Sequence, residues 1–206
     1  LDLTLPLETG RYEISYILGQ DSVVQATTGI EVTEITASLT APLTAAAGST
    51  IQIEWQGPDY RGDIIVVSKP DDKDRSYLNY SYTKGGTPLG LTLPALPGDY
   101  VVKYLAGAGR KVLAISYVTV TEVSASLHAP ATTPAGSKIE VTWDGPDYRG
   151  DIIAIGVPGE NYVTYSYTRN GSPLTVTAPG KPGNYEIRYL MNADRRVIAT
   201  KPLTVQ

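Results

Sequence analysis

Apolar and polar residues alternate along short segments of this chain, most clearly over residues 51–55 and again over residues 139–143. In both segments every second residue is Ile, Val or Trp, and the residues between them are polar. A period of two predicts a β-strand with one buried face. The run Ile64–Val67 is β-branched throughout and too short for a helix, so it predicts a central strand.

Further segments of this kind predict additional strands, and no segment shows a sustained helical period. In the first full copy of the pattern they lie near residues 37–43, 78–82, 89–93, 100–104 and 112–120. The pairs Gly85-Gly86 and Asn170-Gly171 predict hairpin turns. About seven short strands separated by turns predict an all-β fold, an immunoglobulin-like antiparallel sandwich.

The string Gly-Pro-Asp-Tyr-Arg-Gly-Asp-Ile-Ile occurs twice, starting at Gly57 and again at Gly145. A repeat of this kind indicates a tandem array of one module. We expect two full modules, residues 35–121 and 122–206, each large enough to bury a core of its own. Residues 1–34 match only the last third of a module.

The segment 1–34 is expected to be the remnant of a preceding repeat in a longer protein. About three strands would leave one sheet face uncovered and would be marginally stable alone. We therefore expect this segment to dock elsewhere, through strand exchange or a homodimer contact. The junctions near Thr33 and Thr121 lack a Gly/Ser or Pro tract, which predicts a stiff, extended array.

Two aromatic positions in each module carry structural signals. Trp55 and Trp143 end the alternating strands just before the repeated string. Tyr100 and Tyr185 follow a Pro-Gly-x sequence at the start of a strand, where a tyrosine corner is expected.

Taken together, Trp-x-Gly-Pro, Gly-Asp-Ile-Ile, Tyr-x-Tyr-Thr and Pro-Gly-x-Tyr resemble the Ig-like repeats of bacterial proteins that also carry a von Willebrand factor A domain. The resemblance covers both full modules and the segment 1–34, and it implies a fold rather than an activity. A looser similarity links Gly62–Ile65 to the Asp-Trp-Ile-Gly segment of SKICH-type sandwiches, which implies binding of protein partners or a role in targeting.

Composition narrows the classes of function. The net charge of −4 argues against a nucleic-acid partner, because no basic face could offset phosphate repulsion. The chain has no cysteine, which excludes disulfides and thiolate metal sites and suits a bacterial exported protein. No apolar run reaches membrane-spanning length. We expect a periplasmic, cell-surface or secreted location and no cofactor.

The repeated string contains Arg-Gly-Asp, the integrin-recognition tripeptide, at residues 61–63 and 149–151. The aspartates stand at the entrance to an apolar strand, so a structural turn, held by Arg61 and the aspartates, is the favoured interpretation. Calcium is a second hypothesis for this segment. Its candidate ligands are Asp59, Asp63, Asp147 and Asp151. A further acidic cluster at residues 71–74 has no counterpart in the second module.

Paired tyrosines are the candidate ligand surface. Tyr80 and Tyr82, and likewise Tyr165 and Tyr167, are two residues apart and share one face of a strand. Facing outward, they would offer an aromatic platform for a sugar or a peptide. Facing inward, they would belong to the core or its rim, and this second interpretation is favoured.

Catalysis has little support in the sequence. The single histidine, His128, lies in a predicted edge strand, and no nucleophile elbow or phosphate-binding glycine loop accompanies it. The sequence therefore predicts a non-enzymatic spacer or protein-interaction scaffold that contacts protein partners or neighbouring domains. The alternative is a carbohydrate-binding or calcium-stiffened adhesion module.

Overall fold

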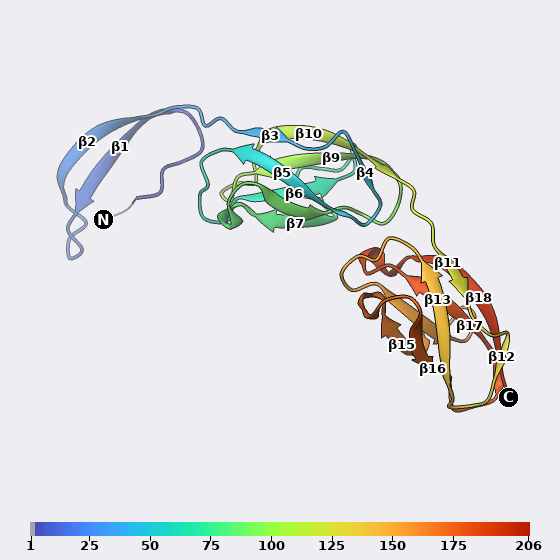
Figure 1. Ribbon diagram of the computed structural model, residues 1–206. Coiled ribbons are helices and arrows are strands. Elements are labelled where there is room, and N and C mark those ends of the chain that lie inside the picture. Colours follow the sequence, from blue (N-terminus) through green and yellow to red (C-terminus); the bar gives the residue numbers. More distant parts are fainter. Residues whose placement is uncertain (1–2) are drawn as a thin grey trace.

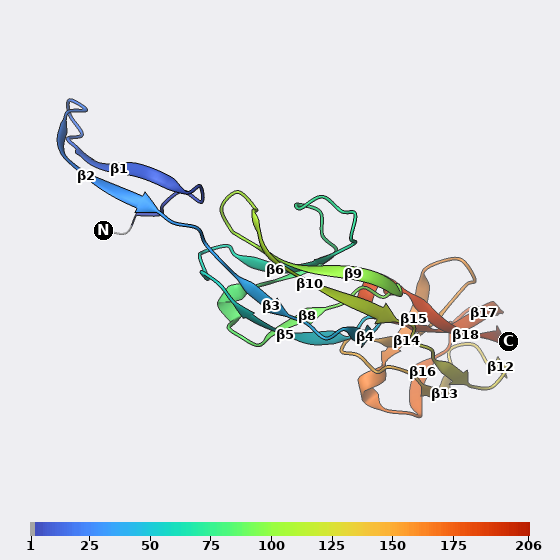
Figure 2. The ribbon, with the colours of Figure 1, turned by 90° about the horizontal axis from the view of Figure 1, so that it is seen from above.

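The computed structural model describes residues 3–206, and almost all regular structure in it is β-strand. The chain forms a two-stranded hairpin followed by two β-sandwiches that lie one after the other (Figure 1). A view from above shows the hairpin standing away from the first sandwich, joined to it by a single connection (Figure 2).

The first sandwich packs a three-stranded sheet against a five-stranded sheet. The small sheet has the order β3-β5-β8, with bounds Ser38–Thr40, Thr50–Gln56 and Leu89–Thr92. The large sheet has the order β4-β10-β9-β6-β7, with bounds Thr44–Ala46, Val112–Thr121, Gly98–Leu105, Ile64–Ser68 and Asn79–Tyr82. All neighbouring strands are antiparallel except β4 and β10.

The second sandwich repeats this order strand for strand. Its small sheet is β11-β13-β16, with bounds Ser126–His128, Lys138–Asp144 and Leu174–Thr177. Its large sheet is β12-β18-β17-β14-β15, with bounds Thr132–Thr133, Val197–Val205, Gly183–Leu190, Ile152–Gly156 and Tyr162–Tyr167. The prediction of tandem immunoglobulin-like sandwiches is confirmed.

The alternating strands place one face in each core. In β5 the residues alternate between exposed and buried, and Ile53 and Trp55 lie inside. The Trp55 ring meets the Tyr104 ring edge to face, with centroids 5.7 Å apart, and Trp143 meets Tyr189 at the same distance. The Trp55 indole N–H donates to the Gly86 carbonyl, and the Trp143 indole N–H donates to the Gly171 carbonyl. Both buried indoles therefore have a hydrogen-bond acceptor.

Strand β6 is buried on both faces, as its continuous apolar run predicts. Ile65 and Val67 point into the main core. Ile64 and Val66 form a smaller cluster with Leu105 on the outer face of the large sheet. Both faces of this sheet are therefore covered in its middle.

Two local predictions need correction. The first strand, expected over 37–43, is divided into β3 and β4, which belong to different sheets. Pro42 lies between them and has no N–H for a ladder, and Pro130 lies between β11 and β12 in the same way. Gly85-Gly86 and Asn170-Gly171 do not make hairpins. They end the 3-10 helices Thr83–Gly85 and Thr168–Asn170, which lead from one sheet to the other.

The tyrosine corners are confirmed. The Tyr100 hydroxyl donates to the Leu96 carbonyl at 2.9 Å, and the Tyr185 hydroxyl donates to the Lys181 carbonyl at 3.0 Å. Tyr12 makes the same bond to Glu8 in the hairpin. The hairpin therefore has the local structure of the last two strands of a sandwich.

The hairpin, β1 (Gly10–Ile17) and β2 (Val24–Val32), has no second sheet against it in the described part of the chain. Tyr16 occupies the hairpin position that Tyr104 occupies in β9. Tyr104 is completely buried, whereas Tyr16 is 63% exposed. Ile17 and Val24, which occupy the positions of Leu105 and Val112 in the outer-face cluster, are 51% and 50% exposed. The hairpin thus presents apolar side chains on both of its faces to solvent.

Candidate functional site

The repeated string contains a buried aspartate that accepts hydrogen bonds from its own turn, from strand β9 and from the corner after β9. The Asp63 carboxylate is 1% exposed. One oxygen accepts from the Tyr60 amide at 2.9 Å and from the Tyr104 hydroxyl at 2.7 Å. The other oxygen accepts from the Gly107 amide at 2.6 Å. The carboxylate therefore joins its own turn to strand β9 and to the corner that follows it.

Tyr104 extends this network. Its hydroxyl accepts from the Asp59 amide at 3.1 Å while it donates to Asp63. Asp59 has a φ of 53°, a left-handed conformation that aspartate tolerates better than most residues. Burial, together with the hydrogen bond to Asp63, raises the pKa of Tyr104 well above its ordinary value. The phenol stays protonated and remains a donor.

The second sandwich contains the same network. Asp151 accepts from the Tyr148 amide at 3.0 Å, from the Tyr189 hydroxyl at 3.0 Å and from the Asn192 amide at 2.7 Å. Tyr189 accepts in turn from the Asp147 amide at 2.9 Å. Burial raises the pKa of Tyr189 as well. The network recurs because the string that builds it recurs.

The aspartates of the string therefore have a structural role, as the sequence favours. The expected role of Arg61 is wrong, since its side chain is exposed and the turn is held by Asp63 instead. Of the calcium candidates, Asp63 and Asp151 are buried with donors around them, and Asp59 and Asp147 are exposed. Within residues 3–206 no three acidic or histidine side chains gather closely enough to hold a metal ion.

A buried cation on the outer face of each large sheet was not anticipated. Lys103 is 5% exposed and donates to the Asp72 carbonyl at 3.3 Å, and it lies 3.7 Å from the Asp74 carboxylate. Arg188 occupies the same position in the second sandwich. It donates to the carbonyls of Val157 and Glu160 and pairs with Glu186. These cations fix the loop between β6 and β7, and between β14 and β15, over the sheet.

The paired tyrosines face outward, so the favoured core interpretation is wrong for them. Tyr80 and Tyr82 are 43% and 54% exposed, Tyr165 is 48% exposed, and Tyr167 is half-buried. Strands β7 and β15 lie at the edge of the large sheets. Their inward positions are polar: Ser81 donates to the Gly90 carbonyl across the sandwich. The phenol rings therefore lie on the outer face of the sheet.

A third tyrosine in each sandwich extends the pair into a row. The rings of Tyr77, Tyr80 and Tyr82 meet edge to face with centroids 5.5 Å apart at both contacts. In the second sandwich the corresponding spacings are 5.3 and 5.5 Å. We call these rows the tyrosine ladders; the second consists of Tyr162, Tyr165 and Tyr167. The neighbouring Tyr82 raises the pKa of Tyr80, so this phenol stays neutral.

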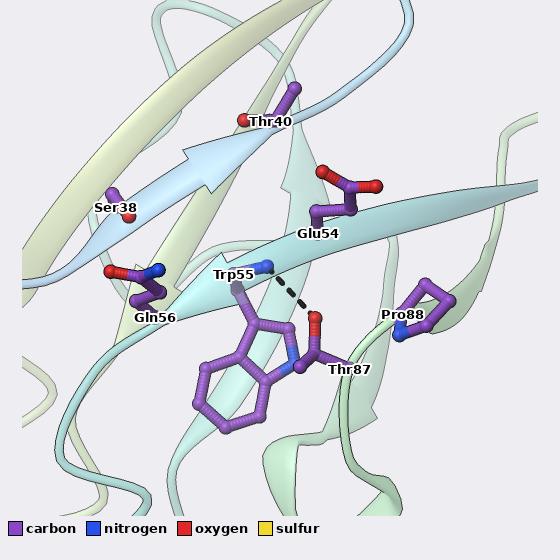
Figure 3. A pocket seen from close by; sticks show the side chains of 7 residues that line it. All are labelled: Ser38, Thr40, Glu54, Trp55, Gln56, Thr87 and Pro88. Carbon is purple, nitrogen blue, oxygen red and sulfur yellow. Dashed lines mark hydrogen bonds between the residues drawn. The ribbon is translucent and has the colours of Figure 1, made fainter.

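A shallow polar groove of about 380 Å³ lies on the outer face of the small sheet of the first sandwich (Figure 3). Its lining residues are Ser38, Thr40, Glu54, Trp55, Gln56, Thr87 and Pro88. The Thr87 hydroxyl accepts from the Trp55 amide at 3.2 Å, the bond drawn in Figure 3, so it already has a partner. Glu54 is the single charged residue of the lining, so the groove has no acid–base pair.

His128 lies in β11, an edge strand of the small sheet, as predicted. His128 lies opposite Thr142 in the antiparallel pair of β11 and β13. Its side chain is exposed.

Comparisons with known proteins find distant similarity to solved structures and nothing more. No protein-family model matches the chain, and no curated protein matches it. Among solved structures, it is similar to immunoglobulin domains 1–5 of Sidekick-1, with 18% identity over 96% of this chain and a TM-score of 0.30. It is also similar to the Yersinia pseudotuberculosis adhesin InvE, with 15% identity over 82% of this chain and a TM-score of 0.31. The chain spans 45% and 58% of these two structures.

Replacing the buried carboxylate is expected to destabilise its sandwich strongly. Asp63→Ala leaves three donors without an acceptor, at about 1–3 kcal/mol for each, so the free energy of unfolding should fall by at least about 3 kcal/mol. Urea unfolding followed by tryptophan fluorescence measures this loss. The matched control is Asp59→Asn, which keeps a residue suited to positive φ and should change stability by less than about 0.5 kcal/mol. Equal effects for the two variants would contradict the assigned role.

Alkaline pH is expected to weaken both sandwiches. The folded-state pKa values of Tyr104 and Tyr189 lie above the unfolded value of about 10. Their contribution to stability is therefore complete below about pH 10 and is lost as the pH rises through the folded pKa values. Absorbance at alkaline pH should show these two phenols ionising only with unfolding. Simultaneous ionisation of all tyrosines in a folded chain would show that the two phenols are not held as described.

Proposed function

We propose that this chain is a non-enzymatic scaffold, a tandem array of Ig-like modules from a bacterial exported or cell-envelope protein. Its units are residues 1–34, 35–121 and 122–206. The array acts as a spacer and as a surface for protein partners, in the periplasm, at the cell surface or after secretion. The resemblance to repeats that accompany von Willebrand factor A domains supports this assignment, and such a domain is a candidate neighbour.

One observation carries the proposal: the polar groups that recur between the two sandwiches are used within the fold. Asp63 and Asp151 accept from donors of their own sandwich, and their tyrosine partners are buried. A recurring active site would leave such groups open to a substrate. Within residues 3–206 there is also no helix long and apolar enough to cross a membrane.

The partner we propose for the hairpin is the hairpin of a second copy of the chain. On the face that corresponds to the inside of a sandwich, Tyr16 exposes a ring of the kind that the sandwiches bury, and covering it gains about 25 cal/mol for each Å² of apolar surface. Two hairpins that pack face to face would restore the missing second sheet. The result is a homodimer.

Sedimentation velocity over a range of concentrations tests this homodimer. The chain should show a concentration-dependent dimer, and Tyr16→Glu should weaken it at least tenfold, because it places a charge in the apolar contact. Tyr117→Glu, at a tyrosine that is 67% exposed outside the hairpin, should leave dimerisation unchanged. A monomer at all concentrations, with rapid hydrogen exchange in residues 1–34, would exclude the homodimer.

Carbohydrate binding is a second candidate function, and the exposed tyrosine ladders favour it. Three rings in a row, at nearly identical spacings in both sandwiches, offer apolar ring surface beside hydroxyl groups. In the second ladder the Arg169 guanidinium lies 4.6 Å from the Tyr167 ring centre, which adds a hydrogen-bond donor. Sugar rings are recognised by this combination of stacking and hydrogen bonding.

A glycan array that includes peptidoglycan fragments tests the ladders. Any glycan bound by the chain should bind about tenfold more weakly to Tyr80→Ala/Tyr82→Ala, since each lost stacking contact is worth about 0.5–1.5 kcal/mol. Tyr117→Ala is the control for an exposed tyrosine outside the ladders. An array without hits would remove this candidate and leave the scaffold.

A further inference from the structure

The loop between β8 and β9 of the first sandwich contributes a residue to the core of the second. Ala95 lies in this loop and has no exposed surface. It packs in the cluster formed by β13, β14 and β17 of the second sandwich. The two sandwiches therefore share part of a core, which a flexible connection would not permit.

Two charged side chains of the second sandwich hold both backbone groups of Ala95. The Asp194 carboxylate accepts from the Ala95 amide at 2.9 Å. The Arg196 guanidinium donates to the Ala95 carbonyl at 2.6 Å. Its other nitrogen donates to the Glu122 carboxylate at 2.7 Å, and Glu122 follows the last residue of β10 in the connection between the sandwiches. We call Asp194 and Arg196 the backbone clamp.

Close packing accompanies the clamp. Gly48 lies in the turn between β4 and β5, with a φ of +75°, and a Cβ on it would lie 2.4 Å from the Met191 methyl group. The same Cβ would lie 3.5 Å from the Tyr148 ring. The turn of the first sandwich thus rests directly on the repeated string of the second, and only glycine fits there without displacing Met191.

The junction between the hairpin and the first sandwich lacks this clamp. Gly109 stands where Asp194 stands in the second sandwich, and it has no carboxylate. Lys111 stands in place of Arg196, and Leu7 in place of Ala95. Among the described residues, no hydrogen bond links residues 3–34 to the remainder of the chain. Cavities of about 750 and 540 Å³ lie along this junction.

We propose that the backbone clamp decides which junctions of the array are rigid. The clamp binds the β8–β9 loop of a preceding Ig-like module. It binds the N–H and C=O groups of one residue of this loop, and that residue, at the position of Ala95, has to be small. Because the clamp binds backbone groups, it accepts loops of different sequence provided that this residue is small. The junction between the two sandwiches is therefore rigid, and the junction between the hairpin and the first sandwich is flexible. The inference rests on the array of the proposed function.

Reciprocal substitutions in the full chain test the clamp. The chain has no cysteine, so Glu54→Cys with Glu140→Cys, and Gln25→Cys with Glu54→Cys, introduce spin-label pairs across the two junctions. Pulsed electron paramagnetic resonance should give a narrow distance distribution between positions 54 and 140. The distribution between positions 25 and 54 should be at least twice as wide. Asp194→Gly/Arg196→Lys should widen the distribution between positions 54 and 140 at least twofold. Glycine is compatible with the φ of 54° at position 194, so the fold is kept.

The opposite transfer should stiffen the first junction. Leu7→Ala/Gly109→Asp/Lys111→Arg supplies the missing clamp, and aspartate tolerates the φ of +65° at position 109. This variant should narrow the distribution between positions 25 and 54. Arg195→Lys, next to the clamp, is the control and should change neither distribution. Thermal unfolding by circular dichroism verifies that every variant is folded.

Equal widths for the two parent label pairs would overturn the proposal, and so would an unchanged width in Asp194→Gly/Arg196→Lys. Labelled chains diluted in unlabelled chains report only distances within one molecule. Failure of the proposed homodimer or of glycan binding would therefore leave this measurement intact, and the two failures are distinguishable.

Discussion

A buried carboxylate in each sandwich is the interaction on which the rest of the structure depends. Asp63 joins the turn before β6 to the tyrosine of β9 and to the corner just after β9, which lie more than 40 residues further along the chain. A buried charge that loses its partners costs several kcal/mol, so the three segments must keep their places together. At the corner, a Cβ on Gly107 would lie 2.5 Å from the Arg61 carbonyl oxygen. This network gives a structural reason for the recurrence of a string of nine residues.

The two sandwiches differ where the fold permits it. The loop between β6 and β7 is acidic and long, whereas its counterpart in the second sandwich is shorter and contains Pro158 and Gly159. Lys103 and Arg188 hold these different loops through backbone carbonyls, which every loop possesses. The outer face is therefore where the two repeats can acquire separate surfaces, while the core and the aspartate network stay alike.

The sequence was sufficient to predict the fold because strands with one buried face leave a period of two. It identified Trp55 and Trp143 as core residues and Tyr100 and Tyr185 as tyrosine corners. It did not determine which way Tyr80 points, because the opposite face of β7 is polar and its Ser81 bonds across the sandwich. The same period fits both orientations, and only the neighbouring strands decide between them.

The contact between the two sandwiches could not be predicted from the sequence, for a different reason. Ala95 and Asp194 are distant along the chain, and the clamp binds a peptide group that any residue carries. Nothing in the side chain of Ala95 marks it as an interface residue. The absence of a Gly or Pro tract predicted stiff junctions at both ends, yet the two junctions differ through Gly109 and Asp194, a difference that only the contacts reveal.

The division of the first strand by Pro42 also has a mechanical consequence. It places β4 beside β10 in a parallel pair, so the first and last parts of the sandwich are neighbours that leave at opposite ends. Bonds such as those from the Thr119 amide to Leu43 and from the Ala47 amide to Thr121 lie across this pair. Tension along the array loads these bonds together in shear instead of opening them one after another. The parallel pair of β12 and β18 gives the second sandwich the same connection.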